Sequence, residues 1–222
     1  MKYLLGAVNT VPLLMDGLVT TLLICGLASI LALAGAVCIV AARKSGIGWA
    51  VWTAKVYVTL MRGLPIVILV FLLYFGVPTL FNLGRVSALW VGVLALAMNG
   101  AAFQSEVLRG AIARLPNGQT EGGYALGLNK FQLWRLVLTP QLLPIALPAL
   151  AGEIGFLIKA SPVLSLITVV DLTRRAQQVT MQTFDPLSPL LAACFLYFLI
   201  IGSISWVSRY LETRLTVGRT QK

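Results

Sequence analysis

The chain has 222 residues, of which 59% are hydrophobic and only 11% charged, and its 17 lysines and arginines outnumber 7 acidic residues to give a net charge of +10. Together with a mean hydropathy of +0.91, this composition excludes an ordinary soluble domain and indicates an integral membrane protein. The lack of histidine and the scarcity of carboxylates argue against a metal centre or an acid-base enzyme.

Five apolar stretches are long enough to cross about 30 Å of hydrocarbon as helices. None alternates apolar and polar residues as the strands of a membrane barrel do, so we expect an all-α membrane protein. The first stretch resembles a secretory signal with Ala34-Gly35-Ala36 as a cleavage site, but it is too long for a signal core and should remain as a helix. The predicted spans cover residues 13–42, 52–81, 86–109, 136–170 and 187–208 of a single domain, residues 1–222.

Lysine and arginine are distributed unevenly between the two sides of these spans. Four of them fall in each of the segments 43–62, 109–135 and 209–222. Because loops that stay in the cytoplasm carry the basic excess, we expect the amino terminus in the periplasm and a multi-pass protein of a bacterial inner membrane. The positive net charge is mostly this bias, with contact to anionic lipids as an addition, and a nucleic-acid partner has little support.

Small residues recur at every fourth position in the first and third spans. Such stripes let helices approach closely in lipid, either within one subunit or between two. The stripes are Ala28, Ala32 and Ala36, and Ala97, Ala101 and Ser105.

Charged residues near the end of the third span suggest an ion cluster. Glu106 and Arg109 are three residues apart and therefore share a helix face. Arg62 starts from the same side of the membrane, just before a predicted break at Gly63-Leu64-Pro65. We interpret these residues as a structural cluster in which Glu106 neutralises Arg62, Arg109 or both; rearrangement during gating is the alternative.

The loop between the third and fourth spans contains a polar segment of helical character. Pro116-Asn117-Gly118 should end the preceding helix, Thr120 is the expected cap of a new one, and Gly127 its expected end. Gly122 and Gly123 each cost about 1 kcal/mol relative to alanine in a helix. Such a short helix therefore needs something to pack on it, and the alternative is a solvated loop.

The fourth span is unusual because prolines recur every four residues, at Pro140, Pro144 and Pro148. Each removes a backbone donor, and the carbonyls this frees are tolerated at membrane depth only beside other helices or water. The pattern predicts a bent helix next to a cavity. The following connection, residues 171–185, is interpreted as a solvated charged loop.

Ionisable and polar residues within the spans are candidates for a transport pathway. Glu153 and Lys159, followed by Ser161-Pro162, suit a broken helix whose buried ammonium binds the carboxylate of an amino acid. The alternative is that other helices hold both charges, or that they extend toward lipid headgroups. Asn99, in the middle of the third span, either lines the same path or forms a hydrogen bond with a neighbouring helix.

Several motifs together resemble those of the permease subunits of ATP-binding cassette (ABC) importers, and more narrowly of polar amino acid importers. The run Glu121-Gly-Gly-Tyr-Ala-Leu-Gly-Leu, followed by Trp134-Arg-Leu-Val-Leu-Thr-Pro-Gln and Ile145-Ala-Leu-Pro, is similar to the EAA loop of that family. The resemblance extends from about residue 16 to 214, and its other motifs are Tyr57-Val-Thr-Leu-Met-Arg-Gly-Leu-Pro, Ser105-Glu-Val-Leu-Arg-Gly-Ala-Ile and Ile158-Lys-Ala-Ser-Pro-Val-Leu-Ser-Leu-Ile.

The resemblance implies a type I importer permease fold with five transmembrane helices and a coupling helix that docks on a cytoplasmic ATPase. It implies that the residues in contact with the ATPase are Gln119, Glu121, Gly122, Gly123, Tyr124, Ala125 and Gly127. Gating or structural roles fall on Arg62, Gly63, Pro65, Glu106, Arg109, Gly110, Pro140 and Pro148, and the substrate pathway on Asn99, Glu153, Lys159 and Ser161.

The implied partners are a second permease subunit, identical or homologous, two ATPase subunits that bind ATP and Mg, and a periplasmic solute-binding protein. No cofactor is expected in this chain, which also lacks a phosphate-binding loop of its own. The family usually has two alanines at 122 and 123, and an aspartate at position 160 where this chain has Ala160, so we expect looser coupling and a preference for neutral or acidic amino acids. An ion-coupled secondary transporter or a channel is the alternative, although no inverted repeat supports it.

Overall fold

The computed structural model describes residues 2–217, which form helices joined by short connections and contain no strand. The prediction of an all-α protein is therefore confirmed. The elements are α1 (Lys2–Arg43), α2 (Gly48–Gly63), α3 (Ile66–Phe71), the π-helix η1 (Leu72–Gly76), α4 (Val77–Phe81), α5 (Ala88–Ala113), α6 (Asn117–Ala125), α7 (Lys130–Gln132), the π-helix η2 (Leu133–Leu138), α8 (Thr139–Ala160), the 3-10 helix η3 (Ser161–Ile167), α9 (Leu172–Thr183) and α10 (Leu187–Val217).

Four helical stretches of the described chain are long and apolar enough to cross a membrane, and a bent pair makes a fifth if it counts as one span. The bend lies at the break expected at Gly63-Leu64-Pro65 within the predicted span 52–81, and turns Gly48–Gly63 and Ile66–Phe81 by 108°. Leu64 has an extended backbone with ψ 132, as expected of a residue before proline, and Pro65 offers no N–H to continue the helix.

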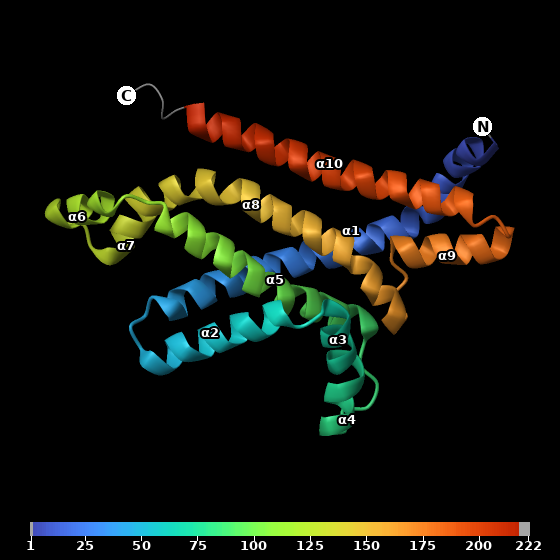
Figure 1. Ribbon diagram of the computed structural model, residues 1–222, viewed down its shortest axis with the longest axis horizontal. Coiled ribbons are helices and arrows are strands. Elements are labelled where there is room, and N and C mark those ends of the chain that lie inside the picture. Colours follow the sequence, from blue (N-terminus) through green and yellow to red (C-terminus); the bar gives the residue numbers. More distant parts are fainter. Residues whose placement is uncertain (1, 218–222) are drawn as a thin grey trace.

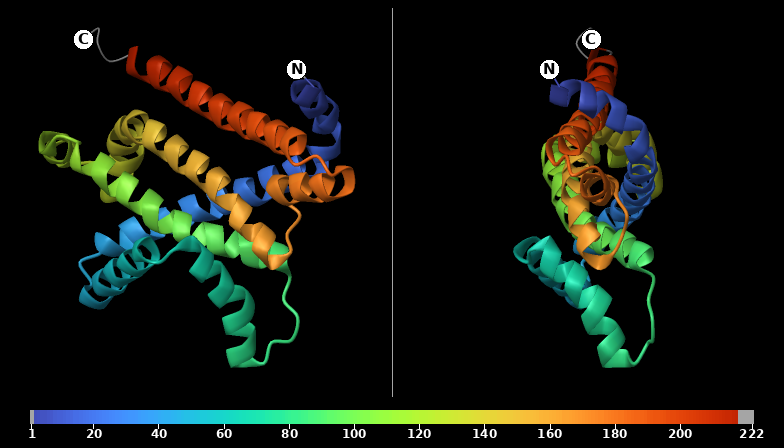
Figure 2. Two further views of the ribbon diagram at one scale, coloured as in Figure 1. Left: turned by 45° about the vertical axis from the view of Figure 1, so that its right-hand side comes forward. Right: turned by 90° about the vertical axis from the view of Figure 1, so that its right-hand side faces the viewer.

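The centre of the bundle is α5, which packs along α1 and against α8, whereas α10 packs on α1 and α8 (Figure 1). In the 18-residue apolar stretch of α5, 61% of the residues are buried, against 17% in that of α10. The helix α10 therefore lies on the outside. The main core joins α1, α5 and η3 through fully buried side chains such as Ile24, Leu96 and Leu164. The helix α3 packs on α5 and η3 through the buried Leu69 and Val70, and α4 extends below the bundle (Figure 2).

The stripes of small residues pack within this one chain. All six members, Ala28, Ala32, Ala36, Ala97, Ala101 and Ser105, are at most 5% exposed. A Cβ added to Gly35 would lie 3.0 Å from the Cβ of Ala101, and one added to Gly100 would lie 3.0 Å from the Cβ of Ala32. Close approach of the α1 and α5 backbones, rather than contact with a second subunit, explains these stripes.

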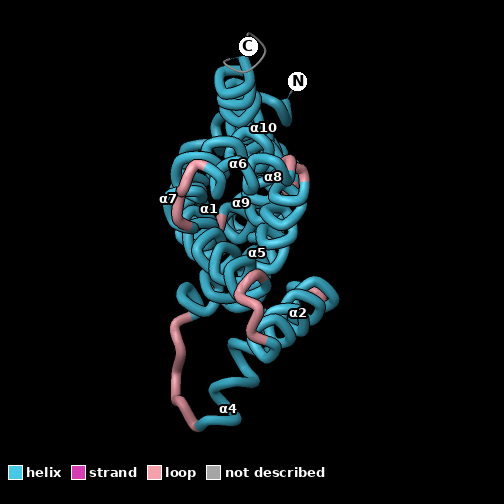
Figure 3. Tube along the Cα trace, turned by 90° about the vertical axis from the view of Figure 1, so that its left-hand side faces the viewer, coloured by secondary structure: helices cyan, strands magenta, loops and turns pink. Residues whose placement is uncertain are grey.

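The two ends of the bundle differ. At one end, α6 and α7 form a short helical elbow between α5 and α8 (Figures 1 and 3). At the other end, α9 lies against the first part of α1 and the start of α10 (Figure 1). Residues 171–185 are therefore largely a helix rather than the expected solvated loop, because Leu172, Ala176 and Val179 form an apolar stripe that is buried.

The fourth span also differs in detail from its prediction. It begins as a π-helix, continues as α8 and ends as a 3-10 helix at Ile167, rather than running to residue 170. In the π-helical turn the N–H of Thr139 donates to the carbonyl of Trp134, five residues back, just before Pro140. Pro144 and Pro148 lie inside α8, which continues as one helix. In the basic tail, α10 reaches Val217, and Arg219 and Lys222 lie outside the described residues.

Candidate functional site

The elbow helix α6 is polar and mostly exposed, and it has the position expected of the coupling helix. Its outward side chains include Gln119, Glu121 and Tyr124, and the following Leu126 is 82% exposed. Tyr124 and Leu126 are therefore large side chains exposed close together in the chain, outside the apolar spans. The helix α6 lies at one end face of the bundle (Figure 3).

The boundaries of α6 correct one prediction and agree with another. The helix starts at Asn117 instead of at Thr120, because Pro116 occupies the cap and its carbonyl accepts from the Gln119 N–H at 3.1 Å. Proline suits this place since the first N–H groups of a helix have no intrahelical partner. At the other end, Gly127 has φ +75, and the Leu128 N–H donates to the Gly123 carbonyl at 3.1 Å, which ends the helix as expected.

The neighbouring glycines Gly122 and Gly123 of α6 have different surroundings. A Cβ on Gly123 would collide with Cδ1 of Leu133, whereas a Cβ on Gly122 would meet nothing within 4 Å. Leu133 is only 1% exposed, so the space left by Gly123 is filled by this chain. Of these two glycines, only Gly122 has open space where a side chain would lie.

Polar contacts connect the elbow to the fourth span. The Gln141 Nε2 amide donates to Oε1 of Gln119 at 2.9 Å, across from α8 to α6. Asn129 and Gln132 form a reciprocal capping box at the start of α7, which satisfies two N–H groups that would otherwise lack partners. A displacement of α6 would therefore be transmitted to η2 and α8.

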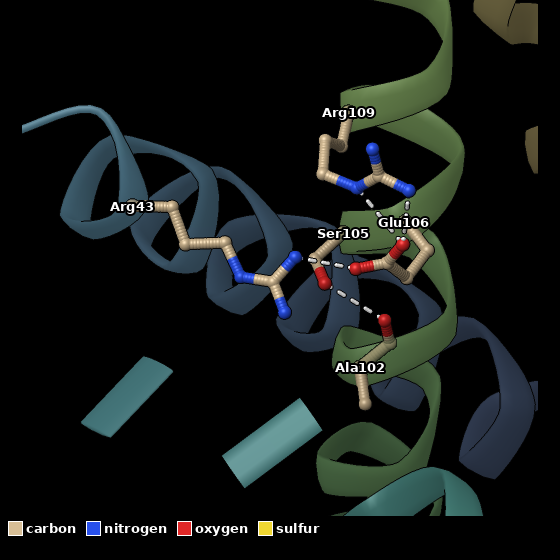
Figure 4. A network of polar contacts seen from close by, with 5 residues as sticks. All are labelled: Arg43, Ala102, Ser105, Glu106 and Arg109. Atoms are coloured by element: carbon tan, nitrogen blue, oxygen red, sulfur yellow. Dashed lines mark hydrogen bonds and ion pairs between the residues drawn. The ribbon is translucent and has the colours of Figure 1, made fainter. Parts of the chain in front are cut away.

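An ion cluster lies near the same end of the bundle (Figure 4). Oε1 of Glu106 accepts from Nη1 of Arg43, and Oε2 accepts from Nε and Nη2 of Arg109 at 2.9 and 2.7 Å. The side chains of Arg43 and Glu106 are 17% and 19% exposed. Because Arg43 is the last residue of α1, the cluster fastens the end of α1 to α5.

The predicted pairing of Glu106 with Arg109 is present, but Arg62 is not a partner of Glu106. The Arg62 guanidinium lies over the Phe103 ring, 5.4 Å from its centroid. Phe103 precedes Glu106 by about one helical turn on α5, so Arg62 does not reach the cluster. The sequence interpretation missed Arg43 as the partner. The sequence did hold one signal for Arg43: it lies in the last turn of an apolar helix, where the helix dipole favours a cation.

Arg62 instead belongs to a second group of residues, between α2, α5 and α8. The rings of Phe103 and Phe156 are 5.9 Å apart, and Glu153, one turn before Phe156 on α8, is half-buried and attracted electrostatically by Arg62. Arg62 thus lies over one ring of an aromatic pair, and a carboxylate lies one helical turn from the residue that carries the other ring. Phe103 and Phe156 were not predicted as site residues, because two aromatic residues in apolar spans do not by themselves indicate a site.

The remaining pathway candidates make other contacts. Asn99 is 3% exposed and its Nδ2 donates to the Met61 carbonyl at 2.9 Å, so it joins α5 to α2. Ser161 is buried, and its hydroxyl donates to the Ile158 carbonyl. Lys159 lines a different pocket, of about 370 Å³, with Thr173 and Tyr197. A separation of six residues places Glu153 and Lys159 roughly 240° apart around a helix.

The glycines and prolines assigned to gating mark the ends of helices. Gly63 is the last residue of α2, Pro65 is the cap of α3 and Pro140 lies in the first turn of α8. Gly110 is in the last turns of α5, where an added Cβ would meet nothing within 4 Å. Their positions suit breaks between rigid segments, and a gating role remains a prediction.

An additional buried acid, Asp171, connects α9 to the bundle. Its Oδ1 caps α9 by accepting from the Arg174 N–H at 2.9 Å. The N–H of Leu172, the residue after Asp171, donates to Oγ1 of Thr21 in α1 at 3.0 Å. Burial raises the pKa of the Asp171 carboxyl above its ordinary value, although hydrogen bonds from the backbone of Arg174 and its neighbours oppose the shift. This residue was treated as part of a solvated loop and was therefore missed.

Comparison with known proteins agrees with this architecture. Residues 36–217 match the family described as the inner membrane component of binding-protein-dependent transport systems. The arginine transport system permease protein ArtQ of Bacillus subtilis is 30% identical over 95% of this chain and 95% of its own length. The glutamine transport system permease protein GlnP of Escherichia coli is 34% identical over 93% of this chain and 94% of its own length.

Solved structures give the same result. One, described as the crystal structure of an amino acid ABC transporter with histidines, superimposes with a TM-score of 0.86 at 30% identity over 95% of this chain and 98% of that one. An inward-facing MetNI methionine ABC transporter superimposes with a TM-score of 0.79 at 18% identity, over 94% of this chain and 98% of that one, and supports the fold alone.

The helical bundle and its elbow thus define the membrane-spanning permease class of ABC importers, with the type I fold. The chain belongs to the family of inner membrane components of binding-protein-dependent transport systems. Its relatives are named as permease proteins of transport systems, which favours this class over an ion-coupled transporter or a membrane enzyme.

Proposed function

We propose that this chain is one of two permease subunits of an importer for polar amino acids in a bacterial inner membrane. Its relatives are named for arginine and glutamine transport, and the matching solved structure is described as an amino acid ABC transporter. Two ATPase subunits bind ATP and Mg and dock at the α6 end, in the cytoplasm. A solute-binding protein docks at the α9 end, in the periplasm.

The observation that carries the coupling part of the proposal is the exposed helix α6 connected to α8. Closure of the ATPase pair moves the surface that receives Tyr124 and Leu126. The Gln119 to Gln141 hydrogen bond and the packing of Gly123 on Leu133 carry this movement into the fourth span. Access alternates because rigid helices rotate about the breaks at their ends, which is the usual form of such transitions.

The substrate path passes the group formed by Arg62, Phe103, Phe156 and Glu153. Every free α-amino acid carries a carboxylate and an ammonium group, and a guanidinium and a carboxylate near the same aromatic pair complement both charges. Arg62, rather than Lys159, binds the carboxylate of the amino acid in this proposal, because Lys159 lines another pocket. Position 160 is alanine, so no second carboxylate lies there for a cationic side chain, and we propose a preference for neutral or acidic amino acids.

The substrate class is tested by competition in proteoliposomes containing this chain with its partner subunits. We expect glutamine or glutamate to reduce uptake of a labelled amino acid more strongly than arginine does. Strongest competition by arginine would contradict the preference. Uptake by this chain alone, driven by an ion gradient without ATP, would contradict the importer assignment itself.

The coupling surface is tested by placing a charge on it. We expect Leu126→Glu to abolish ATPase copurification and transport, and Gly123→Arg to do the same. The matched control is Leu83→Glu, because Leu83 is also exposed (52%) but lies in the connection between α4 and α5, away from α6 (Figure 1). Gly123→Arg also displaces Leu133, so Leu126→Glu is the decisive variant. Normal ATPase binding by a folded Leu126→Glu protein would overturn the proposal.

A further inference from the structure

An apolar groove opens on the outer side of the bundle between α8 and α10. Its volume is about 410 Å³, within the range of about 300–1,000 Å³ common for small-ligand sites. The floor is formed by α1 and α5 and the two walls by α8 and α10. Side chains that line it include Leu33, Leu147, Leu150, Ile154, Val207 and Leu211.

The groove is open along α10, the least buried of the candidate spans. Val207 and Leu211 on one wall are 46% and 40% exposed, and Leu33 on the floor is 42% exposed. In a chain that spans a membrane, apolar surface facing outward at this depth contacts lipid acyl chains. What distinguishes this surface from the rest of the outer face is that it is concave, with walls on two helices.

A cation lies at one end of the groove. Val207, Leu211 and Arg214 are spaced by four and three residues, so they follow one face of α10, and Arg214 is the last residue of the candidate span. The Arg214 guanidinium lies over the Tyr210 ring at 5.3 Å, and its Nε donates to the Tyr210 hydroxyl at 3.1 Å. Arg214 thus follows the groove-lining Leu211 by one turn along α10, although neither Arg214 nor Tyr210 lines the groove itself. Arg209, two residues from Val207, lies on the opposite face of the same helix.

We propose that this groove binds one acyl chain of a phospholipid from the leaflet on the α6 side, and that Arg214 binds the phosphate of its headgroup. The apolar walls match an acyl chain, and a guanidinium at headgroup level matches a phosphate. The lipid fills the space between α8 and α10, and thereby supports the helix that follows the coupling elbow. This site is separate from the amino acid path, which lies between α2, α5 and α8.

The test uses the full chain in nanodiscs that contain a small fraction of phosphatidylglycerol with a diazirine in its acyl chain. After illumination, mass spectrometry locates the adducts. We expect them to concentrate on the α8 and α10 residues that line the groove. Ala151→Trp, which fills the groove, should remove most of this labelling, whereas Leu199→Trp, at an exposed position of α10 outside the groove, should leave it unchanged.

The role of Arg214 is tested in the same way with two probes. Arg214→Gln should lower groove labelling by phosphatidylglycerol by about five-fold, which corresponds to one cation near a lipid surface. Arg209→Gln should not lower it, and a diacylglycerol probe without phosphate should be insensitive to both substitutions. Unchanged melting temperatures would show that the variants are folded.

Three results would overturn the proposal. One is adducts spread evenly over all exposed apolar faces, as expected of bulk lipid. Another is equal labelling by phosphatidylglycerol in Arg214→Gln and Arg209→Gln. The third is a covalent dimer formed from p-benzoylphenylalanine at position 207, which would show that a second copy of this chain occupies the groove.

Discussion

Glu106 is the residue on which the end of α1 and the end of α5 meet. We expect Glu106→Arg to lower the free energy of unfolding by about 2 kcal/mol, since it removes charge-assisted hydrogen bonds to two arginines and places three cations together. Arg43→Glu in the same chain should recover part of the loss, because it restores an opposite charge across the same contact. Arg62→Glu should recover none, since Arg62 lies over Phe103 instead. Thermal melting of the purified variants in detergent measures these changes in stability. Equal recovery by Arg43→Glu and Arg62→Glu would contradict the pairing of Glu106 with Arg43.

Asp171 is a buried acid outside the candidate spans, and its pKa is raised mainly by burial. Below its ordinary pKa the carboxyl is neutral in the folded and the unfolded state. As the pH rises, the unfolded chain loses its proton first, so the free energy of unfolding falls until the folded carboxyl has ionised as well. Stability contributed by this residue is therefore greatest in acid and is lost as the pH rises through the raised pKa.

Substitution of Asp171 separates the charge from the cap. Asp171→Asn keeps an oxygen to accept from the Arg174 N–H but cannot ionise, so its melting temperature should not show this fall with pH and should equal or exceed that of the wild type near neutrality. Asp171→Ala should lower the free energy of unfolding by about 1 kcal/mol, because the cap is lost. Melting curves between acid and neutral pH distinguish the two, and parallel curves for Asp171→Asn and the wild type would show that the carboxyl carries no penalty.

Among the elements, α6 is a short helix whose order depends on what packs against it. Gly122→Ala should stabilise it by about 1 kcal/mol, the difference in helix propensity, because an added Cβ meets open space on this side. Gly123→Ala should gain less or lose stability, because Leu133 must move from a buried position. Hydrogen exchange of the α6 amides compares the two variants directly. Slower exchange in both to the same degree would contradict the contact with Leu133.

In the whole molecule, the contact of α1 with α5 is the largest within the bundle and depends on missing side chains. Gly35→Leu should lower the free energy of unfolding by about 1–3 kcal/mol by overpacking, because a Cβ there already lies 3.0 Å from Ala101. Gly26→Leu is the matched control on the same helix, where an added Cβ meets nothing within 4 Å. Thermal unfolding of both variants tests this, and equal destabilisation would place the close contact elsewhere.

Much of this architecture is fixed locally and was therefore predictable. Hydrophobic length defined the long spans, because a helix that crosses the bilayer must remain apolar for about 20 residues. Gly63-Leu64-Pro65 marked the break in the second span, since proline constrains both its own backbone and that of the preceding residue. Glycine at 127 indicated the end of α6, and the motif beginning at Glu121 indicated the elbow.

What the sequence determined alone, then, is the long apolar helices, the break at Gly63-Leu64-Pro65 and the family resemblance, because these depend on neighbours along the chain. The tertiary structure decided which charges meet. Arg43 rather than Arg62 reaches Glu106, Arg62 lies over Phe103, and Lys159 lines a separate pocket. It also decided that residues 171–185 fold back as α9 on α1. Such pairings depend on the angle at which helices cross and on where each one breaks, and no local pattern of residues contains that information.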